Sequence, residues 1–116
     1  MEATRLAAKA AAESKGARDS FDSARAIKNY LGRAGDVKSW HHIVEESKTD
    51  QFGPQTIHSF DNMVPLPNVD HHAISGFYSS KQEISEGQKV RDWLRGQPFD
   101  QQYEFGLKQL KRIIGD

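Results

Sequence analysis

The chain has 116 residues, of which 36% are hydrophobic, so it has room for one domain with one core, and two full domains are excluded. It contains no cysteine, which excludes disulfide bonds, thiolate metal sites and a cysteine nucleophile. Sixteen Lys and Arg balance sixteen Asp and Glu, a composition unlike that of a uniformly basic nucleic-acid-binding protein. No apolar run approaches the roughly 20 residues that span a bilayer, and the first 15 residues lack the apolar segment of a secretory signal, so we expect no membrane partner.

Helices are predicted in the N-terminal third of the chain. Residues 2–15 hold six alanines among Lys, Arg and Glu, which favours a linker-like helix without a broad apolar stripe. A second helix is predicted after Gly16, with Asp19 or Ser20 as its N-cap and Gly32 at its end. Its apolar face is formed by Phe21, Ala24, Ile27 and Leu31, and we expect this face to pack on the core.

The centre of the chain is expected to contain β-structure. The short apolar pieces Ile43-Val44 and 63–67 are separated by turn-forming residues, which indicates two short strands joined by a long loop. Asp70 can cap a helix that begins at His71. The apolar residues of that helix are Ile74, Phe77 and Tyr78.

Two further helices are predicted at the C-terminal end. Val90, Trp93 and Leu94 fit a short helix that ends at Gly96. The apolar residues Tyr103, Leu107, Leu110 and Ile114 fit a longer helix that stops at Gly115. The chain is therefore predicted to form an α+β domain with helices at both ends.

All histidines lie in the middle of the chain, where residues 41–80 carry one Lys or Arg and five Asp or Glu. An acidic segment rich in imidazoles is typical of a cation site rather than a phosphate-binding face. Imidazole is a good ligand for Zn, Ni or Mn and can also take a proton from water at neutral pH. The five histidines of the chain are His41, His42, His58, His71 and His72.

The consecutive histidines His41 and His42 must divide their roles, because adjacent residues of a strand point to opposite faces. One can face a metal ion held jointly with His71, while the other faces the space where a substrate phosphate would lie. A metal ion with a nearby base supports hydrolysis. Glu45 could hold the ring of a neighbouring histidine, and His58 could brace the loop before Asn62.

The order His-His, Asn and His, with Asn62-Met63-Val64-Pro65-Leu66 leading into His71, resembles the HNH/endonuclease VII superfamily of ββα-metal nucleases. More narrowly, residues 40–45 (WHHIVE), 52–55 (FGPQ) and 91–97 (RDWLRGQ) are similar to the WHH-type nuclease domains at the C-termini of Rhs and other polymorphic bacterial toxins. The resemblance covers roughly residues 40–114. It implies a ββα-metal (His-Me finger) core over about residues 38–80, embedded in N- and C-terminal helices.

The resemblance divides the chain into an N-terminal helical or linker segment, 1–37, and a nuclease domain with C-terminal helices, 38–116. It also implies that the chain is the tail of a larger secreted toxin that acts in the cytoplasm of a target cell. A DNA substrate and a cognate immunity protein are the expected partners. No nucleotide cofactor is expected, since the chain has no phosphate-cradling Gly-rich loop.

The resemblance also assigns roles in phosphodiester hydrolysis. His42 would be the general base, and His41 and His71 would hold one divalent ion, Mg, Mn, Zn or Ni. Asn62 would either orient the base by bridging the loop or bind the metal. In colicin-type DNases a further histidine stands one helical turn after the helix ligand; Ser75 takes that position here, which leaves the coordination open to water or to His72 or Asn62.

Two other functions stay open at this point. An RNase toxin would use the same site, and a non-catalytic binding module would use the histidines only to hold a metal-stabilised fold. A peptidase of the inverted H-x-x-E-H type is not expected, because Glu46 follows His42-Ile43-Val44-Glu45 where the second zinc ligand would stand.

Overall fold

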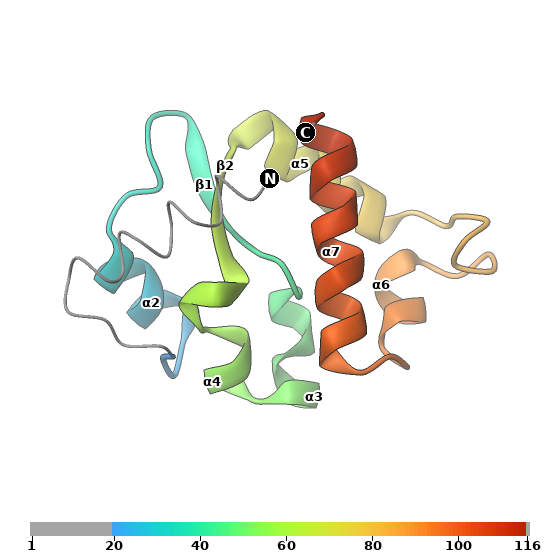
Figure 1. Cartoon of the computed structure of the whole chain (residues 1–116), viewed down its shortest axis with the longest axis horizontal. Coiled ribbons are helices and arrows are strands. Elements are labelled where there is room, and N and C mark those ends of the chain that lie inside the picture. The colour runs from blue at the N-terminus through green and yellow to red at the C-terminus, as the bar shows by residue number, and fades with distance from the viewer. Residues whose placement is uncertain (1–19, 116) are drawn as a thin grey trace.

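The computed structural model describes residues 20–115, and in this part a two-stranded antiparallel sheet lies between helices from both ends of the chain (Figure 1). The strands β1 (Lys38–His42) and β2 (Met63–Pro67) pair in register from Lys38 with Pro67 to His42 with Met63. The predicted α+β class is confirmed. The helices are α2 (Ala24–Leu31), α3 (Thr49–Phe52), α4 (Pro54–Ile57), α5 (Asn68–Ser79), α6 (Val90–Leu94) and α7 (Phe99–Ile114), with 3₁₀ turns at Glu46–Lys48 and Phe60–Asn62.

The hairpin places the candidate site at the end of β1. The apolar pair Ile43-Val44, predicted to lie within a strand, instead follows β1 and is buried. The chain leaves the ladder there, because the backbone N–H of Val44 donates to the side-chain oxygen of Asn62 at 2.8 Å rather than to a strand carbonyl. The second predicted strand, 63–67, is confirmed.

The helix α2 is capped at both ends. Its N-cap is Ser23, whose hydroxyl accepts a hydrogen bond from the N–H of Ala26 at 3.1 Å, so the predicted cap at Asp19 or Ser20 is wrong. Gly32 ends the helix with a φ of +82°, as predicted. The helix predicted over residues 2–15 lies outside the described residues.

The remaining helices follow their apolar patterns closely. The helix α5 begins at Asn68, about one turn before the predicted start, and its N-cap is Pro67, so the predicted cap at Asp70 is wrong. Asp70 lies in the first turn, where a carboxylate interacts favourably with the helix dipole. This start places His71 near the N-terminal end of α5. The helices α6 and α7 are confirmed, and α7 ends at Gly115 in the left-handed conformation.

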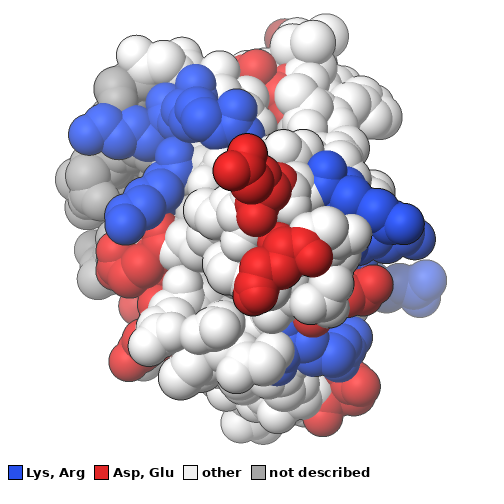
Figure 2. All heavy atoms as spheres, turned by 90° about the vertical axis from the view of Figure 1, so that its right-hand side faces the viewer, with Lys and Arg blue, Asp and Glu red and all other residues white. Residues whose placement is uncertain are grey.

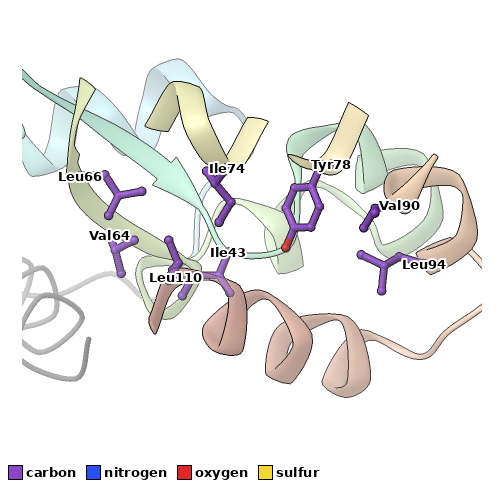
Figure 3. Packing of buried hydrophobic residues seen from close by; sticks show 8 residues of the cluster. All are labelled: Ile43, Val64, Leu66, Ile74, Tyr78, Val90, Leu94 and Leu110. Atoms are coloured by element: carbon purple, nitrogen blue, oxygen red, sulfur yellow. The ribbon is translucent and has the colours of Figure 1, made fainter. Parts of the chain in front are cut away.

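Two apolar clusters pack on the hairpin, which lies between α2 and α7 in Figure 1. Val64 and Leu66 on β2 face the larger cluster, whose side chains lie between α7 and the other elements (Figure 3), and Met63 faces the smaller one. The larger cluster consists of Ile43, Val64, Leu66, Ile74, Tyr78, Val90, Leu94 and Leu110. The smaller cluster consists of Phe21, Ile27, Leu31, Phe60 and Met63. The segment 20–31 is thus part of the core packing, as predicted for the apolar face of its helix.

Among the helices of residues 20–115, none combines the length and the apolar character that crossing a membrane requires.

Candidate metal and catalytic site

Three predicted site residues, His41, His42 and His71, line one pocket with a volume of about 370 Å³. His41 and His42 are buried, with 5% and 7% of their surface exposed, yet both reach this pocket. Their rings turn toward different neighbours: the ring centroid of His41 lies 5.5 Å from that of His71, and His42 lies 5.2 Å from His58. The full lining is His41, His42, Glu45, Glu46, Ser47, His71, Ser75 and Arg91.

His41 carries a buried ring nitrogen, Nε2, with no hydrogen-bond partner. Leaving such a group unpaired costs about 1–3 kcal/mol, which binding a ligand would offset. Burial, followed by the nearby rings of His71 and His42, lowers the pKa of His41 to about 3, so its ring is neutral at physiological pH. A neutral ring with a free nitrogen is the form that coordinates a metal ion.

The rings of His41 and His71 lie at a separation that two ligands of one ion could have. Metal–nitrogen bonds of about 2.1 Å to two rings in a tetrahedral arrangement would place the ring centroids roughly 5 Å apart, close to the observed separation. Within residues 20–115, no group of three or more His, Cys, Asp or Glu side chains could hold an ion together. Ser75 lines the same pocket, and water or phosphate oxygens would complete the coordination.

His72 stands next to His71 on α5, and their ring centroids lie 6.3 Å apart. It is not among the residues that line the pocket. The structure therefore brings His71 to the site and leaves its neighbour outside.

Asn62 is fully buried, and its side chain is used by the backbone. Its oxygen accepts from the N–H of Val44 at 2.8 Å, and its nitrogen donates to the carbonyls of Val44 at 3.0 Å and Ile57 at 2.9 Å. It does not line the pocket. Of the two roles open to Asn62, bridging the loop agrees with these contacts, whereas that of metal ligand does not.

Glu45 lines the pocket but binds an arginine instead of a histidine ring. Its two carboxylate oxygens accept hydrogen bonds from Nε and Nη2 of Arg91 at 2.9 and 2.7 Å. Arg91 also donates to the hydroxyl of Ser79 at 2.8 Å. The predicted contact of Glu45 with a histidine is therefore not present, because the guanidinium group takes both oxygens.

Sequence reasoning missed Arg91, although it lies within the block 91–97 that carries part of the family resemblance. It is 46 residues from Glu45 along the chain and comes from α6. Its side chain is 29% exposed, so it presents a positive charge at the edge of the pocket.

His58 is the histidine that contacts His42. Its Nδ1 lies 3.1 Å from Nε2 of His42, within hydrogen-bond distance, and it is 4% exposed at the end of α4. Burial, and then the neighbouring His58, Lys28 and His71, lowers the pKa of His42 to about 3. The ring of His42 is therefore unprotonated at neutral pH.

The charges near the pocket come from several elements. The positive charge of Lys28 on α2 helps to lower the pKa of His42, His58 and His71, in each case after burial. Figure 2 shows the face that lies to the right in Figure 1, where acidic and basic groups are interspersed and neither sign covers the surface. This face offers no broad basic area for a nucleic acid.

Comparison of the chain with family models, with curated proteins and with solved structures found no match in any of the three.

Proposed function

We propose that the chain is a metal-dependent endonuclease that hydrolyses phosphodiester bonds in DNA, with β1, β2 and α5 as a ββα-metal core. The observation that carries this proposal is the meeting of three histidines at one pocket. The rings of His41 and His71 meet edge to face there, a nitrogen of His41 is buried without a partner, and His42 lines the same space.

His41 and His71 would hold the divalent ion. When bound, it would stabilise negative charge on the phosphoryl oxygens and on the departing 3′ oxygen. Two imidazole nitrogens suit Zn, Ni or Mn better than Mg, which prefers an oxygen-rich site.

His42 would act as the general base that takes a proton from the attacking water. Its lowered pKa keeps the ring in the unprotonated form that this role requires. A phosphodiester in the pocket adds a negative charge beside the ring, which raises its pKa, whereas a divalent ion on His41 and His71 would lower it. The proton acceptor and the pair of candidate metal ligands thus lie at one site.

The resemblance to WHH-type toxin domains extends this proposal. The chain would be the effector domain of a secreted bacterial toxin, it would act in the cytoplasm of a target cell, and a cognate immunity protein would bind it.

Digestion of a supercoiled plasmid in a series of Mg, Mn, Ni and Zn tests the proposal. We expect His42→Ala to lose about 10²- to 10⁴-fold in cutting rate, the usual contribution of a placed base. The matched control His72→Ala, in a neighbouring histidine outside the pocket, should cut at close to the parental rate. Parental activity in folded His42→Ala would contradict the proposal.

Two further experiments distinguish the remaining candidate functions. Digestion of tRNA alongside the plasmid identifies a ribonuclease, if RNA is cut and DNA is not. Removal of the metal with EDTA should abolish cutting while the circular dichroism spectrum stays that of a folded protein. Unfolding in EDTA would indicate a metal-stabilised binding module instead.

A further inference from the structure

We infer that His58 is a positioning residue, which holds His42 in the tautomer that leaves Nδ1 of His42 free to accept a proton. This inference rests on the proposed role of His42 as general base. It starts from the hydrogen-bond distance of 3.1 Å between Nε2 of His42 and Nδ1 of His58. The two rings cross at 73°, so the contact runs through their edges and not through stacked faces.

A hydrogen bond between two neutral imidazoles fixes the tautomer of both rings. Each neutral ring has one N–H and one nitrogen with a lone pair, so one of the facing nitrogens must donate and the other must accept. If Nε2–H of His42 donates to Nδ1 of His58, then Nδ1 of His42 carries the lone pair. In the reverse arrangement, Nδ1 of His42 carries the proton and cannot accept another one.

Only the first arrangement lets His42 act as a base. As Nδ1 of His42 takes a proton from water, a new N–H bond forms there, the water's O–H bond breaks, and its oxygen keeps the electron pair for attack on phosphorus. The ring of His42 then carries a positive charge, and its Nε2–H bond to His58 becomes charge-assisted. Such bonds are roughly twice as strong as neutral ones, so a neutral His58 would stabilise the protonated base, whereas a positive charge on His58 lowers the pKa of His42.

Asn62 connects the backbone segments that carry the two rings. Its side chain binds both backbone groups of Val44, two residues after His42, and also the carbonyl of Ile57, one residue before His58. One buried amide therefore ties together the two segments that carry the histidines. The loop-bridging role of Asn62 therefore includes holding the segments of His42 and His58 together.

The backbone of His58 is held at both of its polar groups. Its N–H donates to the carbonyl of Pro54 at 2.8 Å, and its carbonyl accepts from the N–H of Phe21 at 3.0 Å. Phe21 is itself buried beside α2. The ring of His58 is therefore presented by a segment with little freedom to move, which is what orienting another side chain requires.

The variants His58→Leu and His58→Asn test the inference. Leucine removes the acceptor, whereas the amide of asparagine places a polar atom near the position of Nδ1. We expect His58→Leu to lower kcat about 10- to 100-fold with little change in KM, the range seen when a supporting partner is lost. His58→Asn should recover most of this loss, and an equal loss in both folded variants would contradict the inference.

A second measurement does not depend on activity. Nitrogen-15 NMR of histidine-labelled protein, with His42 assigned by comparison with His42→Gln, reports which ring nitrogen carries the proton. We expect the wild type, with and without metal, to hold His42 protonated at Nε2, and His58→Leu to give a mixture of tautomers. A wild-type His42 protonated at Nδ1 would overturn the inference, even if neither variant folds.

The two measurements distinguish failure of the inference from failure of the proposed function. A protein that cuts neither DNA nor RNA, but whose His42 tautomer shifts in His58→Leu, would refute the nuclease proposal and support the pairing. A His58→Leu variant that cuts DNA at the parental rate, with the tautomer of His42 unchanged, would refute the pairing alone.

Discussion

Both carboxylate oxygens of Glu45 accept hydrogen bonds from Arg91, and the ammonium group of Lys48 lies 3.8 Å from one of them. Lys48 is 1% exposed, and burial lowers its pKa. This small network links the segment after β1 to α6. Glu45 and Arg91 both line the pocket, so this network also holds part of its wall.

The ion pair between Arg91 and Glu45 should contribute more to the free energy of unfolding than the exposed pair between Arg95 and Asp50. Arg91→Gln leaves the half-buried Glu45 without its bidentate partner, and we expect a loss of about 1–3 kcal/mol in the free energy of unfolding. Arg95→Gln removes an ion pair between exposed side chains at 3.4 Å and a hydrogen bond to the carbonyl of Ser47 at 3.2 Å, and it should cost less than about 1 kcal/mol. Urea denaturation of both variants measures the difference, and equal costs would contradict the account.

The site residues differ in how far the sequence could predict them. His41, His42 and His71 belong to a short pattern of fixed spacing, so they were found without knowledge of the fold. His58 and Arg91 meet their partners across 16 and 46 residues of chain. Those contacts depend on tertiary packing, which local spacing does not encode.

At the scale of the elements, α7 approaches the residue that follows β1 closely at Gly106. A Cβ atom built on Gly106 would lie 2.6 Å from the carbonyl oxygen of Ile43, the residue that follows His42. The helix can therefore cover this backbone only because Gly106 has no side chain. Gly76 on α5 is a useful contrast, because a Cβ atom there would meet nothing within 4 Å.

Gly106→Ala and Gly76→Ala should change stability in opposite directions. Alanine forms helices better than glycine by up to about 1 kcal/mol, so Gly76→Ala should stabilise the protein. At Gly106 the clash with Ile43 outweighs this gain, and we expect a net loss of about 1–3 kcal/mol. Thermal unfolding of the two variants measures both effects, and a stabilised Gly106→Ala would show that the approach is less tight than described.

The accuracy of the predicted elements follows from the strength of their local signals. The helix α7 carries a long apolar stripe and a terminal glycine, and both its existence and its end at Gly115 were predicted. The limits of β1 were not, because Ile43, which packs in the larger cluster, and the buried Val44 are apolar for burial rather than for strand pairing. The start of α2 was misplaced because Phe21 packs in the core without being helical.

At the scale of the whole molecule, the hairpin packs between the two apolar clusters. His41 and His42 at the end of β1 are buried in this arrangement. Burial is the first cause of the lowered pKa of four of them, His41, His42, His58 and His71. The folded protein therefore resists taking up protons that the unfolded chain binds readily. This couples the stability of the entire fold to pH.

The metal-free protein should lose stability as the pH falls below about 6.5. An unfolded histidine has a pKa near 6.5, whereas that of folded His41 or His42 is about 3. Between these two pKa values the unfolded state binds more protons than the folded state, so the free energy of unfolding decreases as the pH falls. Above about pH 6.5 these groups do not change the free energy of unfolding with pH. Urea denaturation in EDTA at a series of pH values measures this dependence.

The variant His41→Gln provides the control for this pH dependence. It lacks one of the buried titrating rings, so its stability should fall less steeply with acid than that of the wild type. Stability that stays constant from neutral pH down to about pH 4 would show that the histidines are not held in their neutral form by the fold.

The central claim is that His41 and His71 hold one divalent ion, and calorimetric titration of Mn or Zn at neutral pH tests it most directly. We predict one ion per chain in the wild type, a roughly tenfold or greater loss of affinity in His41→Ala and in His71→Ala, and wild-type affinity in His72→Ala. Unchanged affinity in both His41→Ala and His71→Ala, with each variant folded, would contradict the claim.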